Sequence, residues 1–272
     1  MRILLTGDFD RDEFAATVAE IGRIGEVVRE SSLDSAIRQL ASDATPVDLI
    51  IIAQARPGQY SAASVEVLRR CAPLAPLVAL LGSWCDGETR SAAPWPGVTR
   101  VPWHQGQSRL VQEVRRLAAG ELTVFSQPLT ASAEERLLHS TLHRHDAIAG
   151  SLAVLSAHRE QADWLAAACL SAGMSTVIFR TIPQNAVEGV QVVVWDAGLP
   201  GPDLPAICRQ MIGRFAGAAV LALLDFPRCD DVRDLRRAGA VAVLAKPLSV
   251  SDLTESVRAA AAGRQTFSAN TG

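Results

Sequence analysis

The chain has 272 residues, of which 49% are hydrophobic and 20% charged, and its formal net charge at pH 7 is −3. This length suits two folded domains of about 120 to 140 residues each, and the acidic balance excludes the basic face that nucleic-acid binding requires. No apolar run approaches the roughly 18 residues of a membrane span. The first eight residues turn acidic too early for a signal peptide. The five widely spaced cysteines, without a C-x-x-C motif, indicate free thiols in the cytoplasm.

The first 120 residues alternate short apolar runs with helical patterns, which is typical of a parallel sheet with helices on both faces. Strands are predicted near residues 3–6, 26–29, 49–53, 77–81 and 98–101, and helices near residues 13–21, 33–41, 62–70 and 108–118. The segment 83–97 is a poor helix, because Gly87, Pro94 and Pro96 interrupt it.

Residues 121–149 are predicted to link two domains and to include a helix with Leu138 and Leu142 on one side. His139 and His143 lie four residues apart on this helix, a spacing that can bind zinc. Because no cysteine or acidic cluster completes a tetrahedral set, a polar helix face in solvent is the favoured interpretation. We expect no metal and no cofactor.

Residues 150–265 repeat the alternation, and residues 266–272 form a tail. Strands are predicted near residues 152–156, 175–180, 190–195, 219–224 and 241–245, and helices near residues 161–171, 204–212, 231–238 and 251–262. The second helix is nearly absent, since only residues 181–189 separate the second strand from the third. The fold class is therefore α/β, with two flavodoxin-like (βα)5 domains that each hold a doubly wound, five-stranded parallel sheet.

The two halves align with each other at a fixed offset of 143 residues. Residues 48–58 lie over residues 191–201, and residues 78–81 lie over residues 221–224 without a gap. A register held over this length indicates two copies of one domain. At the position with the greatest chemical interest, copy two has Asp196 and copy one has Ala53.

The segments 196–201 and 239–247 resemble the receiver domains of two-component response regulators. Such domains carry a phosphorylated Asp at the end of the third strand, followed by x-x-x-Pro, and a Lys-Pro pair at the end of the fifth strand. The resemblance covers residues 1–120 and 150–265 and is stronger in copy two. It implies that Asp196 is the candidate phospho-acceptor and that Lys246 is the candidate phosphate-contacting residue.

The resemblance also implies two acidic residues after the first strand, which hold Mg²⁺ together with the acceptor. Copy two has Ser156 and Ala157 there. We therefore expect weak Mg²⁺ binding or none, and Asp196 and Lys246 as a structural ion pair at the carboxyl edge of the sheet. Residual phosphorylation of Asp196 is the alternative.

Two further family positions differ in copy two. The position of the phosphate-reading Thr or Ser is assigned to Leu224, with Asp225 adjacent, and the aromatic position carries Val243.

Copy one departs further from the family pattern. Asp8 matches the second acidic residue, but Gly7 replaces the first, Ala53 replaces the acceptor, Gly82 falls at the Thr position and Trp103 replaces the lysine. Asp8 and Asp196 are therefore isolated remnants of a metal site, and a phosphoryl switch in copy one is close to excluded. Trp103 is expected to fill the empty pocket with apolar area.

Trp84, Trp95 and Trp103 all belong to the last third of copy one. In receiver domains, the face made by the fourth helix, the fifth strand and the fifth helix is the usual partner surface, and aromatic residues are common interface anchors. All three are candidate interface residues. The alternative is that they fill a core weakened by the interrupted fourth helix.

No catalytic residue is predicted, because the chain has neither a G-x-G-x-x-G nor a P-loop motif and Asp196 has no triad partner. We expect a non-catalytic signalling protein of two-component type, with tandem pseudo-receiver domains that bind a protein partner independently of phosphorylation. The partner would be a histidine kinase, an output protein or a second copy, and neither nucleic acid nor membrane is expected. The alternatives are a regulator phosphorylated on Asp196 and a small-ligand sensor that uses the vacated receiver pocket.

Overall fold

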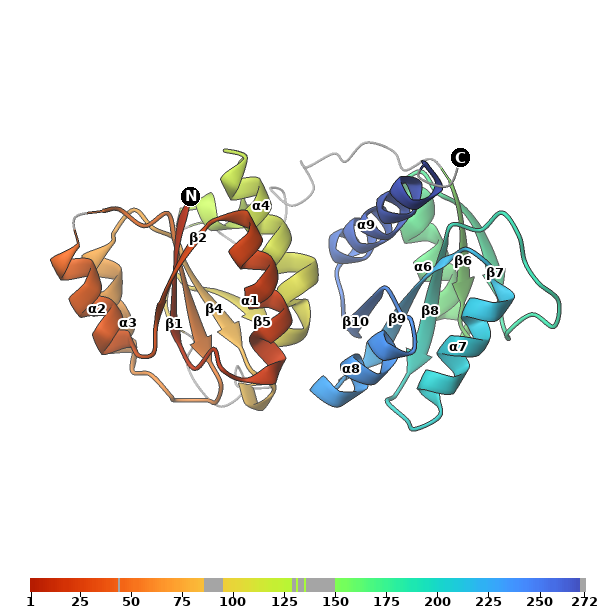
Figure 1. Ribbon diagram of the computed structural model, residues 1–272, viewed down its shortest axis with the longest axis horizontal. Helices are drawn as coiled ribbons and strands as arrows, with labels where there is room; N and C mark the ends of the chain where they lie inside the picture. Colours follow the sequence, from red (N-terminus) through yellow and green to blue (C-terminus); the bar gives the residue numbers. More distant parts are fainter. Residues whose placement is uncertain (44, 86–94, 129–130, 132–134, 136–149, 270–272) are drawn as a thin grey trace. The chain divides into compact units, whose positions relative to one another are not determined.

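The computed structural model describes residues 1–43, 45–85, 95–128, 131, 135 and 150–269. The chain divides into two compact units, Met1–His143 and Arg144–Gly272, which we call domain one and domain two. Each contains one parallel five-stranded sheet with helices packed on it (Figure 1). None of the described helices is long and apolar enough to cross a membrane.

Domain one is built from five strands and four α-helices within its described residues. In chain order they are β1 (Arg2–Gly7), α1 (Asp12–Ile24), β2 (Glu26–Glu30), α2 (Leu33–Ser42), β3 (Leu49–Gln54), α3 (Ala62–Cys71), β4 (Leu77–Leu81), β5 (Thr99–Pro102) and α4 (Val111–Ala118). Short 3-10 helices follow β4 at Ser83–Cys85 (η1) and β5 at Trp103–Gln105 (η3), and a π-helix at Gly106–Leu110 (η4) leads into α4. Most of the predicted interrupted helix, residues 86–94, lies outside the described residues.

Domain two follows a similar plan, but it lacks the second helix and has an α-helix, α8, between its fourth and fifth strands. Its elements are β6 (Ser151–Leu155), α6 (Arg159–Ser171), β7 (Ser175–Phe179), β8 (Val192–Gly198), α7 (Leu204–Arg214), β9 (Ala219–Asp225), α8 (Cys229–Arg237), β10 (Ala242–Lys246) and α9 (Val250–Ala269). Residues 180–191, between β7 and β8, contain no helix.

The strand order confirms the predicted fold class. The sheet of domain one runs β2-β1-β3-β4-β5, and that of domain two runs β10-β9-β8-β6-β7. Counted from the first strand of each domain, both orders are 2-1-3-4-5, the order of flavodoxin-like proteins. In this order the carboxyl ends of the first and third strands lie side by side, at the point where ligands bind in such sheets.

The predicted register holds from the third strand onward. Leu49 and Val192, which begin β3 and β8, are 143 residues apart, whereas Glu26 and Ser175, which begin β2 and β7, are 149 apart. The difference is absorbed where domain one has α2 and domain two has a shorter loop.

Successive residues of a strand point to opposite faces of its sheet, so each sheet has two cores. In β6 of domain two, Leu152 and Val154 pack with residues of α6 and α9, whereas Ala153 and Leu155 pack with residues of α7 and α8. The central strand β3 is buried along its whole length, as expected of a parallel strand covered on both faces. All five cysteines are free thiols, and three of them are buried.

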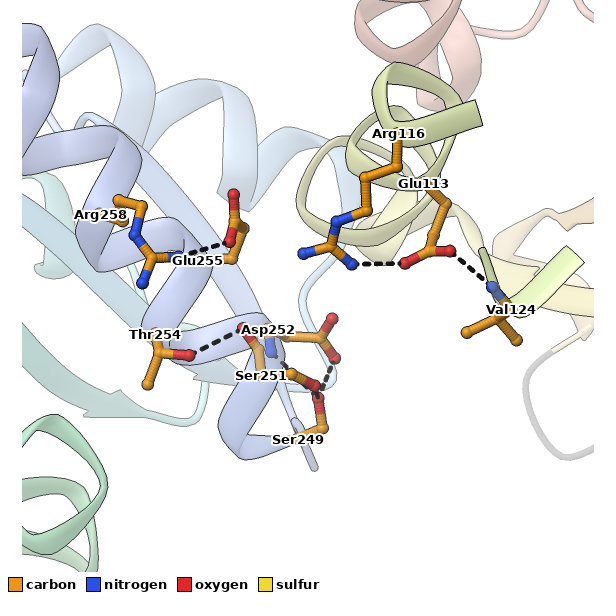
Figure 2. A network of polar contacts seen from close by, with 9 residues as sticks. All are labelled: Glu113, Arg116, Val124, Ser249, Ser251, Asp252, Thr254, Glu255 and Arg258. Carbon is orange, nitrogen blue, oxygen red and sulfur yellow. Dashed lines mark hydrogen bonds and ion pairs between the residues drawn. The ribbon is translucent and has the colours of Figure 1, made fainter. Parts of the chain in front are cut away.

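The segment after α4 packs on domain one. Thr123 and Phe125 are buried, and the backbone N–H of Val124 donates to Glu113 Oε2 at 2.8 Å. Glu113 also pairs with Arg116 at 2.8 Å (Figure 2). Residues 123–125 thus pack on domain one beyond the predicted boundary at residue 120. The predicted linker helix, with Leu138, Leu142, His139 and His143, lies outside the described residues.

At the other end of the chain, α9 begins with a side-chain cap. The backbone N–H of Asp252 donates to Ser249 Oγ at 3.0 Å, and the Ser249 hydroxyl donates to the Asp252 carboxylate at 2.8 Å (Figure 2). Such caps satisfy backbone donors that have no partner within the helix. The helix then continues to Ala269, so the predicted tail boundary at residue 265 falls inside it.

Candidate functional site

Four polar side chains meet at the carboxyl edge of the domain-two sheet. Ser156 follows β6, Asp196 lies in β8, Asp225 ends β9 and Lys246 ends β10. These four strands are consecutive in the sheet. Because parallel strands end at the same edge, the fold brings together residues that are up to 90 positions apart in the sequence.

Lys246 and Asp196 form a short ion pair, as the sequence predicts. Lys246 Nζ lies 2.5 Å from Asp196 Oδ1 and 3.1 Å from Asp225 Oδ1. The Ser156 hydroxyl donates to the second carboxylate oxygen of Asp196, at 2.7 Å. The Asp196 side chain is only 2% exposed. Both of its oxygens therefore already have partners, and little of the group faces solvent.

Ser156 takes the place where the resemblance implies a metal-binding carboxylate. Its side chain is buried, and its oxygen also accepts from the backbone N–H of His158 at 3.2 Å. The hydroxyl is thus held in the turn after β6 and aimed at Asp196. It is neutral, so it stabilises the Asp196 carboxylate without adding the negative charge that would attract a divalent cation.

The charge on Lys246 is stabilised by its surroundings. Burial alone would lower the pKa of Lys246, but hydrogen bonds to Asp196 and Asp225 and the charges of these carboxylates outweigh it and raise that pKa above its ordinary value. The lysine is therefore a fixed cation between two carboxylates at neutral pH.

Asp225 is the site residue that the sequence interpretation did not assign. Leu224, expected at the Thr position, is fully buried in the core instead. Asp225 is paired in register with Lys246. Gly82 falls at the Thr position of copy one, and the offset of 143 places Asp225 over it. The repeat therefore predicts Asp225, not Leu224, at the Thr position of copy two. The assignment to Leu224 was wrong by one residue, which in a strand reverses the face to which a side chain points.

The position of Asp225 has a chemical consequence. A Thr or Ser there would offer a hydroxyl to a phosphate. A carboxylate instead competes for Lys246 and repels an incoming anion. Val243, at the family's aromatic position, is buried in the core.

A metal site is not assembled in the part of the chain that the structure describes. Those residues contain no group of three or more His, Cys, Asp or Glu side chains that could hold a metal ion. Asp8, the remnant in domain one, faces Arg11 at 3.9 Å.

In domain one the equivalent edge is filled by side chains from neighbouring segments. Ala53 is buried at the acceptor position. Gly7 has φ +105°, and a Cβ there would lie 2.7 Å from the Tyr60 hydroxyl oxygen and 2.7 Å from the Ala53 carbonyl oxygen. Gln59 donates to the Tyr60 hydroxyl at 3.1 Å. Burial, followed by the nearby Asp8 carboxylate, raises the pKa of Tyr60.

Glu13 fills the other half of this edge. A Cβ on Gly82 would lie 2.5 Å from Glu13 Oε1. The Glu13 carboxylate accepts from the backbone N–H of Ser83 and from Arg11 Nε, each at 3.0 Å. Among the described residues of domain one, Ala53 thus stands in place of the acceptor, and Tyr60 and Glu13 occupy the space beside Gly7 and Gly82.

The three candidate interface tryptophans have different environments. Trp84 is 74% exposed. Trp95 is buried in the domain-one core, with its ring centroid 6.3 Å from that of Tyr60. Trp103 is buried at the position equivalent to Lys246. Trp95 and Trp103 are therefore not exposed interface residues, since both supply apolar area to the interior, whereas Trp84 remains a candidate interface residue.

A cavity of about 550 Å³ lies beside the domain-two site. It is lined by the loops after β8 and β9, and it reaches Asp225. Leu199 and Phe226 both line the cavity, and both side chains are exposed.

Comparisons with known proteins found similar solved structures. No protein-family model matches the chain, and no curated protein matches it. A response regulator receiver domain protein from Clostridium thermocellum is 16% identical and covers 43% of this chain and 98% of its own, with a TM-score of 0.38. The receiver domain of a LuxO repressor protein from Vibrio parahaemolyticus is 14% identical over 46% of this chain and 99% of its own, with a TM-score of 0.40.

A two-component response regulator/GGDEF domain protein aligns over 97% of this chain and 99% of its own, at 15% identity and a TM-score of 0.36. The fold assignment itself rests on the order and direction of the strands in the two sheets.

Proposed function

We propose that the chain is a non-catalytic signalling protein of two-component type that acts by binding a protein partner, without phosphorylation of Asp196. The observation that carries the proposal is the arrangement around Lys246, which is already neutralised by Asp196 and Asp225. A receiver would use this lysine for the phosphoryl group. Here an incoming phosphoryl group would have to displace a carboxylate of the protein.

The remaining site residues support the same proposal. Phosphoryl transfer to a carboxylate needs cations that offset the charge of the phosphoryl oxygens. Ser156 cannot act as a carboxylate ligand for Mg²⁺, and Asp196 has no free oxygen on its carboxylate. Domain one has Ala53 in place of the acceptor. What remains in both domains is a stable α/β scaffold with surface available for recognition.

Partner binding is expected to survive the loss of the Asp196 charge. Proteins that co-purify with the full-length chain from its source cell would be quantified for the wild type, Asp196→Asn and Trp84→Ala. Asp196→Asn keeps the shape of the side chain, so we expect an unchanged partner set. Trp84→Ala is expected to weaken binding by about 2 kcal/mol, roughly 30-fold, as at interface hot spots.

The control for this comparison is the stability of each variant, since removing one partner of a buried pair can destabilise a domain by itself. Loss of partners from Asp196→Asn at an unchanged melting temperature, with Trp84→Ala normal, would contradict the proposal. It would support the alternative of a regulator phosphorylated on Asp196.

The cavity beside Asp225 favours a second candidate function, a small-ligand sensor. Its volume of about 550 Å³ is within the range of small-molecule sites. A thermal-shift screen against metabolites tests this candidate. A ligand whose stabilising effect is lost when Phe226 or Leu199 is replaced by a charged residue would support it over partner binding alone.

A further inference from the structure

The outer edge of the domain-two sheet is formed by β7, the last strand in the order β10-β9-β8-β6-β7. Val177 and Ile178 of this strand are 44% and 38% exposed. At the offset of 149, Val177 is equivalent to Val28 of β2. Val28 packs against the core that includes Leu33 and Ala36 of α2. Domain two has a loop instead of this helix (Figure 1), so the equivalent strand is left partly uncovered.

The two edge strands also differ in charge. β2 reads EVVRE, and β7 reads STVIF. Charged side chains on an edge strand are a common protection against pairing with another chain. In domain one, β2 carries such charged residues, whereas β7 carries none. β7 is instead rich in β-branched and aromatic residues, which favour strand pairing.

Within the residues that the structure describes, β7 pairs only with β6, on its inner side. The Ser175 N–H donates inward to the Gly150 carbonyl at 2.9 Å, and the Phe179 carbonyl accepts inward from the Ser156 N–H at 3.1 Å. Because backbone groups alternate in direction along a strand, Thr176 and Ile178 point their N–H and C=O groups outward.

The loop that follows β7 is hydrogen-bonded and packed elsewhere in domain two. Within residues 180–191, which the structure describes in full, backbone hydrogen bonds join the loop to Arg214, Ser151 and Ala219. Val187 donates to the Arg214 carbonyl at 2.8 Å, and Gln191 donates to the Ser151 carbonyl at 2.9 Å. The loop packs on the sheet face and at the start of β6.

We propose that β7 is a dimerisation edge, on which β7 of a second copy of this chain pairs antiparallel about a twofold axis at Val177. In this register Thr176 of one copy lies opposite Ile178 of the other, and each such pair exchanges two backbone hydrogen bonds. The two Val177 side chains lie on the same face of the joined sheet and cover each other where α2 covers Val28 in domain one.

Charge favours a second copy as the occupant, because a twofold axis at Val177 places residues that are equally far from Val177 along the two strands opposite each other. For β7 every opposed pair is uncharged. The same arrangement on β2 would set Glu26 opposite Glu30, and like charges directly opposite are destabilising. The strand is short, so the interface is small and its dissociation constant is expected to be on the order of micromolar or weaker.

Sedimentation velocity of the full-length chain over a concentration series tests this inference. The wild type is expected to change from monomer to dimer as its concentration rises. Val177→Lys sets two ammonium groups opposite each other and is expected to stay monomeric at concentrations at least about tenfold higher. The matched control is Val67→Lys on α3, because Val67 is also 44% exposed; it should dimerise like the wild type.

A second variant separates loss of pairing from loss of folding. Val177→Cys places two thiols across the twofold axis, where Cβ atoms are about 4.5 to 5.5 Å apart in a non-hydrogen-bonded pair. Oxidised glutathione is expected to convert it to a disulfide-linked dimer, whereas Val67→Cys and the wild type, which has five free thiols, should not convert.

A wild type that stays monomeric, a dimer that persists in Val177→Lys, or a dimer that Val177→Cys does not cross-link would overturn the inference. It does not rest on the proposed function, because the β7 edge contains none of the four residues at the carboxyl edge of the sheet.

Discussion

Replacing Lys246 by methionine is expected to destabilise domain two by about 3 to 5 kcal/mol. Methionine retains the length and apolar stem of the side chain but removes the cation that neutralises Asp196. The Asp196 carboxylate, 2% exposed, would remain buried with only the Ser156 hydroxyl as a side-chain partner. Hydrogen exchange read peptide by peptide gives the free energy of unfolding of each domain within the full chain.

The double variant Lys246→Met/Asp196→Asn is the control for this prediction. It removes both charges, and replacing a buried pair by neutral groups costs far less than breaking it. We expect it to recover most of the lost stability. If Lys246→Met alone lowered the free energy of unfolding of domain two by less than about 1 kcal/mol, the ion pair would not be what stabilises the buried Asp196 carboxylate. The pKa of Lys246 is raised above its ordinary 10.5, so the contribution of the pair is complete below that pH and is lost as the pH rises beyond it.

Domain one is expected to lose up to about 3 kcal/mol of stability as the pH falls from 6.5 towards 4. Burial of His104 lowers its pKa from 6.5 to about 4. Between these values the unfolded chain binds a proton that the folded domain does not, so acid favours unfolding. The contribution is complete above pH 6.5 and is lost as the pH falls towards 4.

His104→Phe is expected to flatten this pH dependence, since phenylalanine keeps a ring beside Trp103 and does not titrate. The ring centroids of His104 and Trp103 are 5.8 Å apart. The same hydrogen-exchange measurement at several pH values checks the prediction. His158→Phe, at an exposed position of domain two, is the matched control. An unchanged pH slope in His104→Phe would show that another group causes the loss.

The fold could be predicted from the sequence because its strands are buried β-branched runs. The run from Leu49 to Gln54 has this character, and its repeat at the offset of 143 fixes the equivalent strand in domain two. The missing second helix could also be predicted from the short connection. The site could be predicted in part, since Asp196 and Lys246 both lie towards the carboxyl ends of strands in one parallel sheet.

The positions of the remaining site residues could not be predicted from the strand pattern, because it does not say where side chains from loops and helices lie. Tyr60 and Glu13 reach the edge of domain one from a loop and from a helix, and no register relates them to Gly7 and Gly82. Trp95 is buried, whereas Trp84 is exposed, yet large aromatic side chains suit a core and an interface equally well. Whether each tryptophan is buried or exposed depends on how the neighbouring segments pack against it.

The central claim is that the domain-two site does not accept a phosphoryl group. Its most direct test is the intact mass of the full-length chain after incubation with acetyl phosphate and Mg²⁺. The triple variant Ser156→Asp/Ala157→Asp/Asp225→Thr restores the implied metal ligands and removes the competing carboxylate, and we expect it to gain one phosphoryl group. The account predicts an unchanged mass for the wild type under the same conditions. A phosphoryl group on the wild type that is absent from Asp196→Asn would contradict it.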